Sequence, residues 1–193
     1  MIKISRPVCP YPTALENKKY NHPKNKQALK EANSDKCMYC ESKISHNGFA
    51  HIEHFRPKAQ DKHPDLEFIW DNLGYACEKC NNEKSNKFHN DLPYIDPYQE
   101  IPSEFFIAYG PWLFPKNGNE RADISISDID LNRLGLLEKR SEKINDIQKV
   151  LTACHRNPNL ALRKIAFDEL KRESDSDKEY SFFIDALFNA NNV

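Results

Sequence analysis

The sequence contains no apolar segment close to the about 20 residues that a membrane-spanning helix needs. Its first residues, 1–7, also lack the long apolar core of a secretory signal peptide. These absences predict a cytoplasmic protein with no part in a membrane. Thiols in the cytoplasm are normally reduced, so paired cysteines there are more often metal ligands than disulfides.

Glycine is also scarce, at five in 193 residues, and the net charge of −1 is close to zero. A near-neutral chain has no overall attraction for nucleic acid. Its charge is uneven, however: residues 1–60 carry 11 Lys and Arg against 5 Asp and Glu, whereas residues 91–193 carry 13 against 18. Either the basic first half meets phosphate on one side of the protein, or the asymmetry is an accident of a solvated surface.

The residue pattern predicts an α+β fold in four segments. Residues 1–36 form an N-terminal extension that is partly helical, and residues 37–90 form a small core. Residues 91–126 are rich in proline and aromatic residues and predict a segment that wraps over that core. Residues 127–193 predict a helical C-terminal region, with one apolar stripe at helical spacing made of Leu134, Leu137, Ile144, Ile147 and Leu151.

Within the core, apolar and polar residues alternate over residues 49–55, which predicts a strand after a turn at Gly48. A second extended segment is expected over residues 66–76, interrupted near Asp71. A short helix is expected from about residue 79 to residue 88. The expected order is therefore knuckle, strand, strand, knuckle and helix.

The two knuckles are Cys-x-x-Cys pairs separated by 36 residues, and they consist of Cys37, Cys40, Cys77 and Cys80. Four thiolates at this spacing match a tetrahedral structural Zn²⁺ site. A chain with few glycines and a modest local core needs such a site to hold its small strands. Two disulfides, a redox pair and unrelated buried cysteines are the alternatives. Cys9 and Cys154 have no paired partner in the sequence and are expected to be free thiols.

Between the pairs, Glu53 and His54 are adjacent at the end of the expected first strand. A carboxylate can bind a divalent metal, and a histidine has a pKa near neutrality, so the two suit metal-assisted phosphodiester hydrolysis. Asn81 follows the last cysteine, where its carbonyl oxygen could complete a cation site. Lys84 lies one helical turn further on the same face, where it would contact phosphate. Asn72 precedes the second strand, where its amide would brace the loop after His54.

These residues resemble the HNH endonucleases, whose core is the ββα-metal fold. The resemblance rests on Glu53-His54-x-x-Pro57, Asp71-Asn72-Leu73 and Cys77-x-x-Cys80-Asn81-x-x-Lys84. By motif position it implies that His54 is the general base, that Asn72 orients it, and that Glu53 and Asn81 bind the catalytic metal. Most members have Asp in place of this Glu, and many have His in place of Asn81. Because both residues here offer oxygen, the implied metal is Mg²⁺ or Mn²⁺.

A narrower resemblance extends over most of the chain, to the PtuB-type HNH effectors of the Septu anti-phage system, which also occur beside some retrons. It is carried by residues 36–41, 52–58, 70–73, the Asp96-Pro97 segment and residues 131–133. The resemblance implies an endonuclease acting on DNA, or on RNA, in bacterial antiviral defence. It also implies a PtuA-type ATPase partner.

Other interpretations compete with these. Arg56 and Lys58 either contact substrate phosphate or are solvated at the strand end. His51 is expected to be structural. The competing function is a non-catalytic zinc module that binds nucleic acid or a partner protein. The enzyme is favoured because Glu53, His54 and Asn81 are all chemically competent. A stand-alone restriction or homing nuclease would need a separate sequence-reading module, and none is recognisable.

Overall fold

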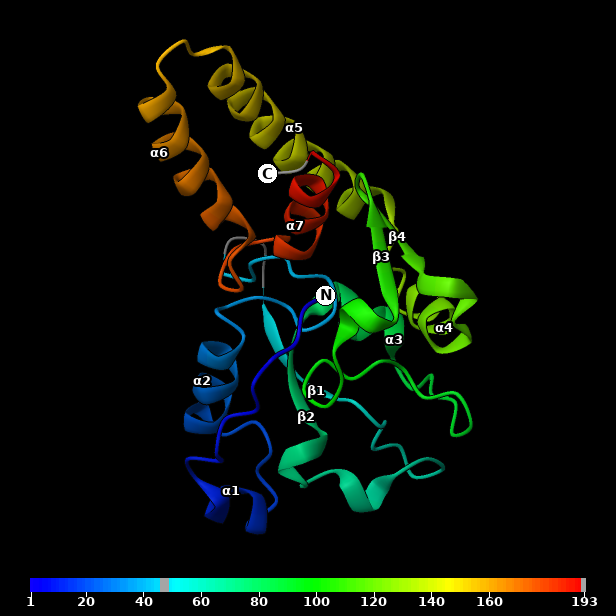
Figure 1. The fold of residues 1–193 in the computed structure, drawn as a ribbon. Helices are drawn as coiled ribbons and strands as arrows, with labels where there is room; N and C mark the ends of the chain where they lie inside the picture. Colours follow the sequence, from blue (N-terminus) through cyan, green and yellow to red (C-terminus); the bar gives the residue numbers. More distant parts are fainter. Residues whose placement is uncertain (46–48, 192–193) are drawn as a thin grey trace.

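The computed structural model describes residues 1–45 and 49–191, so Gly48, expected in a turn, lies outside the described residues. Its centre is a two-stranded antiparallel sheet of β1 (Ala50–His54) and β2 (Leu73–Cys77), with α3 (Glu78–Lys84) packed on both strands. Helix α2 (Pro23–Ala32) lies on another side of the sheet, beside β2 (Figure 1). The predicted α+β class and ββα core are therefore confirmed.

The connection between β1 and β2 contains two short 3-10 turns, Pro64–Leu66 and Trp70–Asn72, and β2 runs directly into α3. In the sheet, Glu53 pairs with Gly74, and a Cβ at Gly74 would lie only 2.3 Å from Met38 Sδ. Glycine at this position therefore lets the first cysteine knuckle pack directly against β2.

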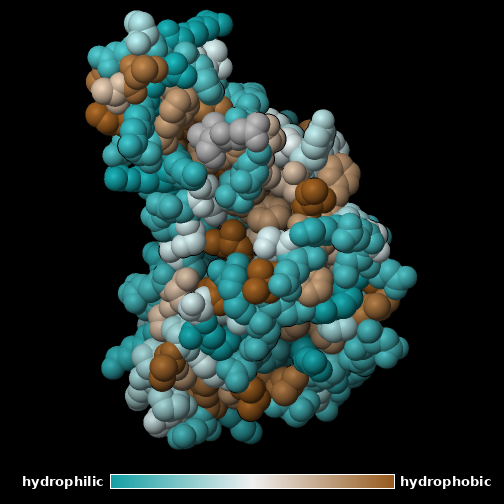
Figure 2. Space-filling model, viewed as in Figure 1, coloured by the Kyte–Doolittle hydropathy of each residue, from teal (hydrophilic) through white to brown (hydrophobic). Residues whose placement is uncertain are grey.

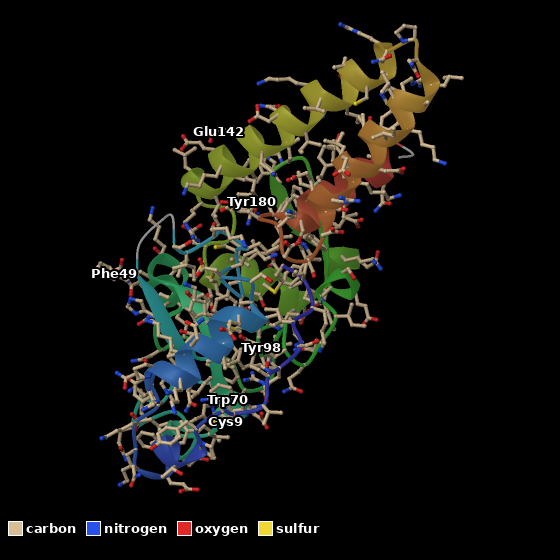
Figure 3. All side chains as sticks on the ribbon, turned by 90° about the vertical axis from the view of Figure 1, so that its left-hand side faces the viewer. Cys9, Phe49, Trp70, Tyr98, Glu142 and Tyr180 are labelled. Atoms are coloured by element: carbon tan, nitrogen blue, oxygen red, sulfur yellow. The ribbon has the colours of Figure 1, made fainter. Side chains whose placement is uncertain are left out.

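The N-terminal residues form an extended strap before α1 (Pro12–Glu16). The strap is held at several points, because Ile4 N donates to Pro97 O at 2.8 Å and Trp70 Nε1 donates to Pro7 O at 2.8 Å. Trp70 and Cys9 lie close together in the view of Figure 3, at the opposite end of the molecule from the C-terminal helices. The extension is thus packed against the core.

The segment after the core forms a hairpin of β3 (Phe106–Tyr109) and β4 (Trp112–Pro115). Its inner face is buried through Phe106, Ala108 and Leu113, and its outer face exposes Ile107, Tyr109, Trp112 and Phe114. Gly110 takes a positive φ of 54° at the turn, a conformation that glycine adopts without steric cost.

A helix that the sequence analysis missed follows the hairpin. Helix α4 runs over Glu120–Asp128 and is capped by Asn119, whose Oδ1 accepts from Ala122 N at 3.0 Å. The expectation of helix from residue 127 onward was therefore wrong at its start. An asparagine followed by acidic residues is a typical helix start, so a signal was present in the sequence.

Helices α5 (Leu134–Arg156) and α6 (Leu160–Lys171) form an arm that projects from the body, and α7 (Ser181–Ala190) packs at its base (Figure 1). The buried stripe of α5 differs from the expected one: Leu134 is 71% exposed, and the stripe consists of Leu136, Arg140, Ile144, Ile147, Leu151 and Cys154.

The surface seen in Figure 2 is mostly hydrophilic, with apolar side chains scattered over both the arm and the body. Those exposed on α6 include Leu160, Leu162 and Ile165. In the described part of the chain, no helix combines the length and the apolar character that crossing a membrane needs, and α5, with 23 residues, is too polar.

The first knuckle is held by a segment that is far away in sequence. Residues 178–181, just before and at the start of α7, contact residues 36–43 at successive positions. The bonds are Lys36 Nζ to Lys178 O at 2.8 Å, Lys43 N to Glu179 Oε1 at 2.9 Å, Ser42 Oγ with Tyr180 Oη at 2.9 Å, and Ser181 Oγ to Glu41 Oε2 at 2.9 Å. Figure 3 shows Tyr180 where the C-terminal helices meet the body.

Candidate functional site

The four paired cysteines converge on one point between the sheet and α3. Their sulfur atoms all lie within 4.8 Å of one another, and Cys77 alone of the four is partly exposed. All six cysteines of the chain are free thiols rather than disulfides. Four convergent sulfurs fit a tetrahedral Zn²⁺ with no open position, which is the geometry of a structural site.

A cation from the C-terminal half contacts this cluster. Arg133, just before α5, directs Nη2 at Cys80 Sγ at 3.4 Å. Four thiolates around Zn²⁺ carry two net negative charges, so a neighbouring guanidinium lowers the electrostatic cost of burying them. Arg133 belongs to a segment that carries the narrower resemblance, but its position in the sequence gives no sign of this contact.

A second site lies beside the sheet, in an open pocket of about 520 Å³. Of the predicted site residues, Glu53, His54, Asn81 and Lys58 line it, whereas Arg56, Asn72 and Lys84 do not. The other lining residues are Tyr20, His51, Ile52, Pro57, Asn82, Ser85 and Asn86. The pocket thus combines β1 and α3 of the core with one residue of the N-terminal extension.

Glu53 is almost fully buried at the floor of this pocket. Its Oε1 accepts from Lys84 Nζ at 2.6 Å and from Tyr39 Oη at 3.3 Å. Burial raises the pKa of Glu53, while the charge of Lys84 opposes that rise. Both of these contacts reach the same oxygen, so they leave Oε2 as the atom that could bind a cation.

Lys84 does not take the position expected from its helical spacing. Its side chain is 1% exposed, and the ammonium donates to His54 O at 2.8 Å in addition to its pairing with Glu53. The predicted contact between Lys84 and substrate phosphate is therefore wrong for this structure. The reason is that Lys84 faces the buried carboxylate, which attracts the ammonium more strongly than solvent does.

His54 ends β1 and is 8% exposed. Its Nε2 lies 3.0 Å from Glu67 O. A carbonyl can only accept, so Nε2 carries the hydrogen and Nδ1 keeps a free lone pair. Burial lowers the pKa of His54, with the charges of Lys58 and Lys84 acting in the same direction. A neutral imidazole with a free ring nitrogen is the form that a general base requires.

Asn72 braces the loop after β1. Its Oδ1 accepts from Arg56 N at 2.8 Å, and its Nδ2 donates to Arg56 O at 2.9 Å and to Leu66 O at 3.1 Å. The expected brace is present, and its hydrogen bonds reach the backbone of the residues that follow His54.

Asn81 lies at the middle of α3 and faces His51 of β1. Its Nδ2 is 3.4 Å from His51 Nδ1, which leaves the carbonyl oxygen Oδ1 to face a cation. His51 and Glu53 are two residues apart on the strand and so lie on the same face. The donor set of Glu53 and Asn81 fits a cation that prefers oxygen ligands, with His51 beside it. His51, expected from the sequence to be structural, thus lines the pocket.

The two tentative substrate contacts differ in their surroundings. Lys58 reaches Glu67 Oε1 at 2.9 Å and remains partly exposed at the pocket. Arg56 is exposed, with its guanidinium 5.5 Å from the centre of the Phe88 ring. Lys58 is therefore the better placed of the two to meet an anion at the pocket.

Comparison with known proteins agrees with this geometry. Residues 37–87 match the HNH endonuclease family. The chain is 30% identical to the Septu protein PtuB of Bacillus thuringiensis over 122 residues, which is 63% of this chain and 46% of that protein. It is 27% identical to the Septu protein PtuB of Bacillus mycoides (strain KBAB4) over 152 residues, covering 64% of this chain and 52% of that protein.

The chain spans about half the length of the curated relatives it matches. The family match includes both cysteine pairs, both strands of the core sheet and α3. Residues 37–87 therefore form an HNH endonuclease domain, in a chain that is similar to the Septu protein PtuB.

Proposed function

We propose that this chain is a metal-dependent endonuclease that hydrolyses phosphodiester bonds, with DNA as the favoured substrate and RNA as the alternative. We further propose that it acts as the effector of a bacterial anti-phage complex with a PtuA-type ATPase. The observation that carries the enzymatic part is the pocket that joins Glu53, His54 and Asn81. A zinc module that served only for binding would not need an acid, a base and an amide around one opening.

In the proposed mechanism, Glu53 and Asn81 would hold a Mg²⁺ or Mn²⁺ ion through their side-chain oxygens. Such an ion would supply charge neutralisation for the phosphate and the leaving oxygen. His54 Nδ1 accepts a proton from the attacking water, and Glu67 O retains the proton on Nε2. Asn72 holds the loop that follows the base, and Lys58 is placed to meet a phosphate oxygen at the pocket.

The cysteine cluster has a separate, structural role in this proposal. Cys37, Cys40, Cys77 and Cys80 hold Zn²⁺ with four ligands and no open position. The cluster lies at the far end of β2 from the residue that pairs with His54, because Leu73 begins this strand and Cys77 ends it. Loss of the base should therefore leave the zinc in place.

Substrate capture is proposed to depend on a partner. The net charge of −1 gives little long-range attraction for a polyanion. We therefore expect weak cleavage by the purified chain alone and efficient cleavage with the ATPase present. Efficient cleavage by the isolated chain would overturn this part of the proposal.

The decisive experiment compares wild type, His54→Ala and the control His89→Ala on duplex DNA, single-stranded DNA and RNA. The control histidine is 51% exposed and pairs with Asp128, and it does not line the pocket. Loss of a general base should slow cleavage about 10²- to 10⁴-fold, while zinc per chain stays unchanged in both variants.

Three outcomes would contradict the proposal. Equal loss of zinc and activity in His54→Ala would mean that the structural and catalytic roles were misassigned. Unchanged cleavage by this variant would exclude His54 as the base. Absence of cleavage by wild type on all three substrates, with and without the ATPase, would favour the binding module instead.

A further inference from the structure

We propose that Tyr20, which lies outside the HNH match, is a positioning residue that holds the imidazole of His54 in its reactive orientation. This inference rests on the proposed function, since it assigns His54 the role of base. Tyr20 lies in the N-terminal extension, between α1 and α2, and lines the same pocket.

The two rings are in direct contact. The ring centres of Tyr20 and His54 are 4.7 Å apart, and their planes meet at 75°, an edge-to-face arrangement. Such pairs are stabilised by the opposite partial charges of a ring edge and a ring face. The hydrogen bond from Nε2 to Glu67 O directs one ring nitrogen but still allows the ring to tilt about that bond. Contact with a second ring limits the tilt.

Tyr20 is itself held from another side. The Lys58 ammonium lies 4.1 Å from the centre of the Tyr20 ring, within the range of a cation–π contact. The same ammonium pairs with Glu67 Oε1 at 2.9 Å. Glu67 therefore contacts His54 through its backbone and Lys58 through its side chain. Tyr20, His54, Glu67 and Lys58 thus form a closed circuit in which each contacts the next. The phenyl ring of Phe68, with its centre 6.3 Å from that of Tyr20, adds a further neighbour.

The extension that carries Tyr20 is attached to the core on both sides of this residue. Lys26 Nζ of α2 donates to Ala50 O of β1 at 2.7 Å. Arg6 Nη1 donates to Leu73 O at 2.8 Å and to Trp70 O at 3.0 Å. These bonds tie the extension to β1, which lines the pocket, and to the start of β2, which pairs with it, so Tyr20 has a defined position relative to His54.

The experiment compares Tyr20→Leu, which removes the ring, with Tyr20→Phe, which keeps it. The matched control is Tyr11→Leu, because Tyr11 also lies in the extension and contacts a histidine ring, that of His22, at 4.6 Å. Neither Tyr11 nor His22 lines the pocket. All proteins are assayed in the preparation, alone or with the ATPase, in which wild type cleaves, and zinc content and melting temperature are recorded.

We expect Tyr20→Leu to lower kcat by about tenfold or more with KM unchanged, because a small misplacement of a reacting group slows the chemical step without weakening binding. Tyr20→Phe should cleave close to the wild-type rate, and Tyr11→Leu should match wild type. A wild-type kcat in Tyr20→Leu would overturn the inference. So would a raised KM with unchanged kcat, since Tyr20 would then be a substrate contact.

Two further outcomes keep this inference separate from the proposed function. If Tyr20→Leu loses zinc or unfolds, the test rests on Tyr20→Phe. A kcat of Tyr20→Phe as low as that of His54→Ala would overturn the inference, because the aromatic ring would then not suffice to position His54. If wild type cleaves no substrate, the proposed function fails and the role of Tyr20 falls with it. If both the wild type and Tyr20→Leu are fully active, the inference on Tyr20 is overturned but the proposed function stands.

Discussion

Lys84 and Glu53 form an ion pair of 2.6 Å in which both side chains are almost fully buried. The lysine belongs to α3 and the carboxylate to β1, so the pair connects the helix to the strand beneath it. An internal ammonium compensates the carboxylate when no cation is present and occupies only one of its oxygens. The site can therefore keep an ionised acid in a buried position before any metal binds.

Removal of this ammonium should destabilise the fold. Lys84→Met keeps most of the side-chain volume but leaves Glu53 without its counter-ion, and breaking a buried pair costs about 3–5 kcal/mol of unfolding free energy. Chemical denaturation measures this loss, with Lys79→Met as the control because Lys79 is exposed on the same helix. The double variant with Glu53→Gln should be less destabilised than the two single changes would sum to. Simple additivity would mean that the pair contributes nothing.

Asn72→Ala should weaken the loop that follows the base. The change removes three hydrogen bonds to the backbone of Arg56 and Leu66 in a site where Asn72 is 6% exposed. Buried groups left without a partner cost about 1–3 kcal/mol, and cleavage should fall because the His54 loop is less well held. Thermal unfolding and cleavage kinetics are measured together. Full activity in a destabilised Asn72→Ala protein would show that the brace serves the fold alone.

Loss of one zinc ligand should affect folding as well as activity. Cys80→Ser should release the metal and remove most of the cooperative unfolding transition, because structural Zn²⁺ contributes about 10 kcal/mol or more to such sites. Cys9→Ser is the matched control, since the nearest polar contact of Cys9 is Asn25, at 3.7 Å. Zinc content and circular dichroism on heating report the effect. A Cys80→Ser protein that melts like wild type would contradict a structural role.

The pH dependence of cleavage should reflect the environment of His54. Burial, together with the charges of Lys58 and Lys84, lowers its pKa below the usual 6.5. A base with a lowered pKa stays unprotonated as the solution becomes more acidic, so its activity persists to lower pH. At saturating metal, the acidic limb of the kcat profile should therefore have its midpoint below pH 6.5. An acidic limb centred above 6.5 would be inconsistent with His54 as the buried base.

The elements of the core could be predicted because their signals are local. A few residues suffice to show each of three signals: two cysteines separated by two residues, a strand in which apolar and polar residues alternate, and a helix that follows a knuckle. The start of α6 has a local signal of the same kind: Asn159 caps it, and its Oδ1 accepts from Ala161 N and Leu162 N.

The missed features depend on contacts between distant segments. Helical spacing placed Lys84 correctly on α3. That its side chain is buried rather than exposed to substrate follows from its ion pair with Glu53, 31 residues earlier, which the local pattern does not reveal. Tyr20 has no motif around it, and its contact with His54 exists only because the extension packs on the sheet. Arg140 was overlooked in the buried stripe of α5 because arginine is rarely buried; here it donates to Leu131 O at 2.9 Å and lies 4.1 Å from the centre of the Phe183 ring.

The contacts between residues 36–43 and residues 178–181 have a consequence for anyone who would excise the nuclease. The match to the HNH endonuclease family ends at residue 87, but the segment that holds the first knuckle lies about ninety residues further on. A fragment that ended at residue 87 would lose the hydrogen bonds from residues 178–181 to the first knuckle. It would also lose the guanidinium of Arg133 beside Cys80. Grafting this HNH domain into another scaffold therefore requires the C-terminal helices to be included.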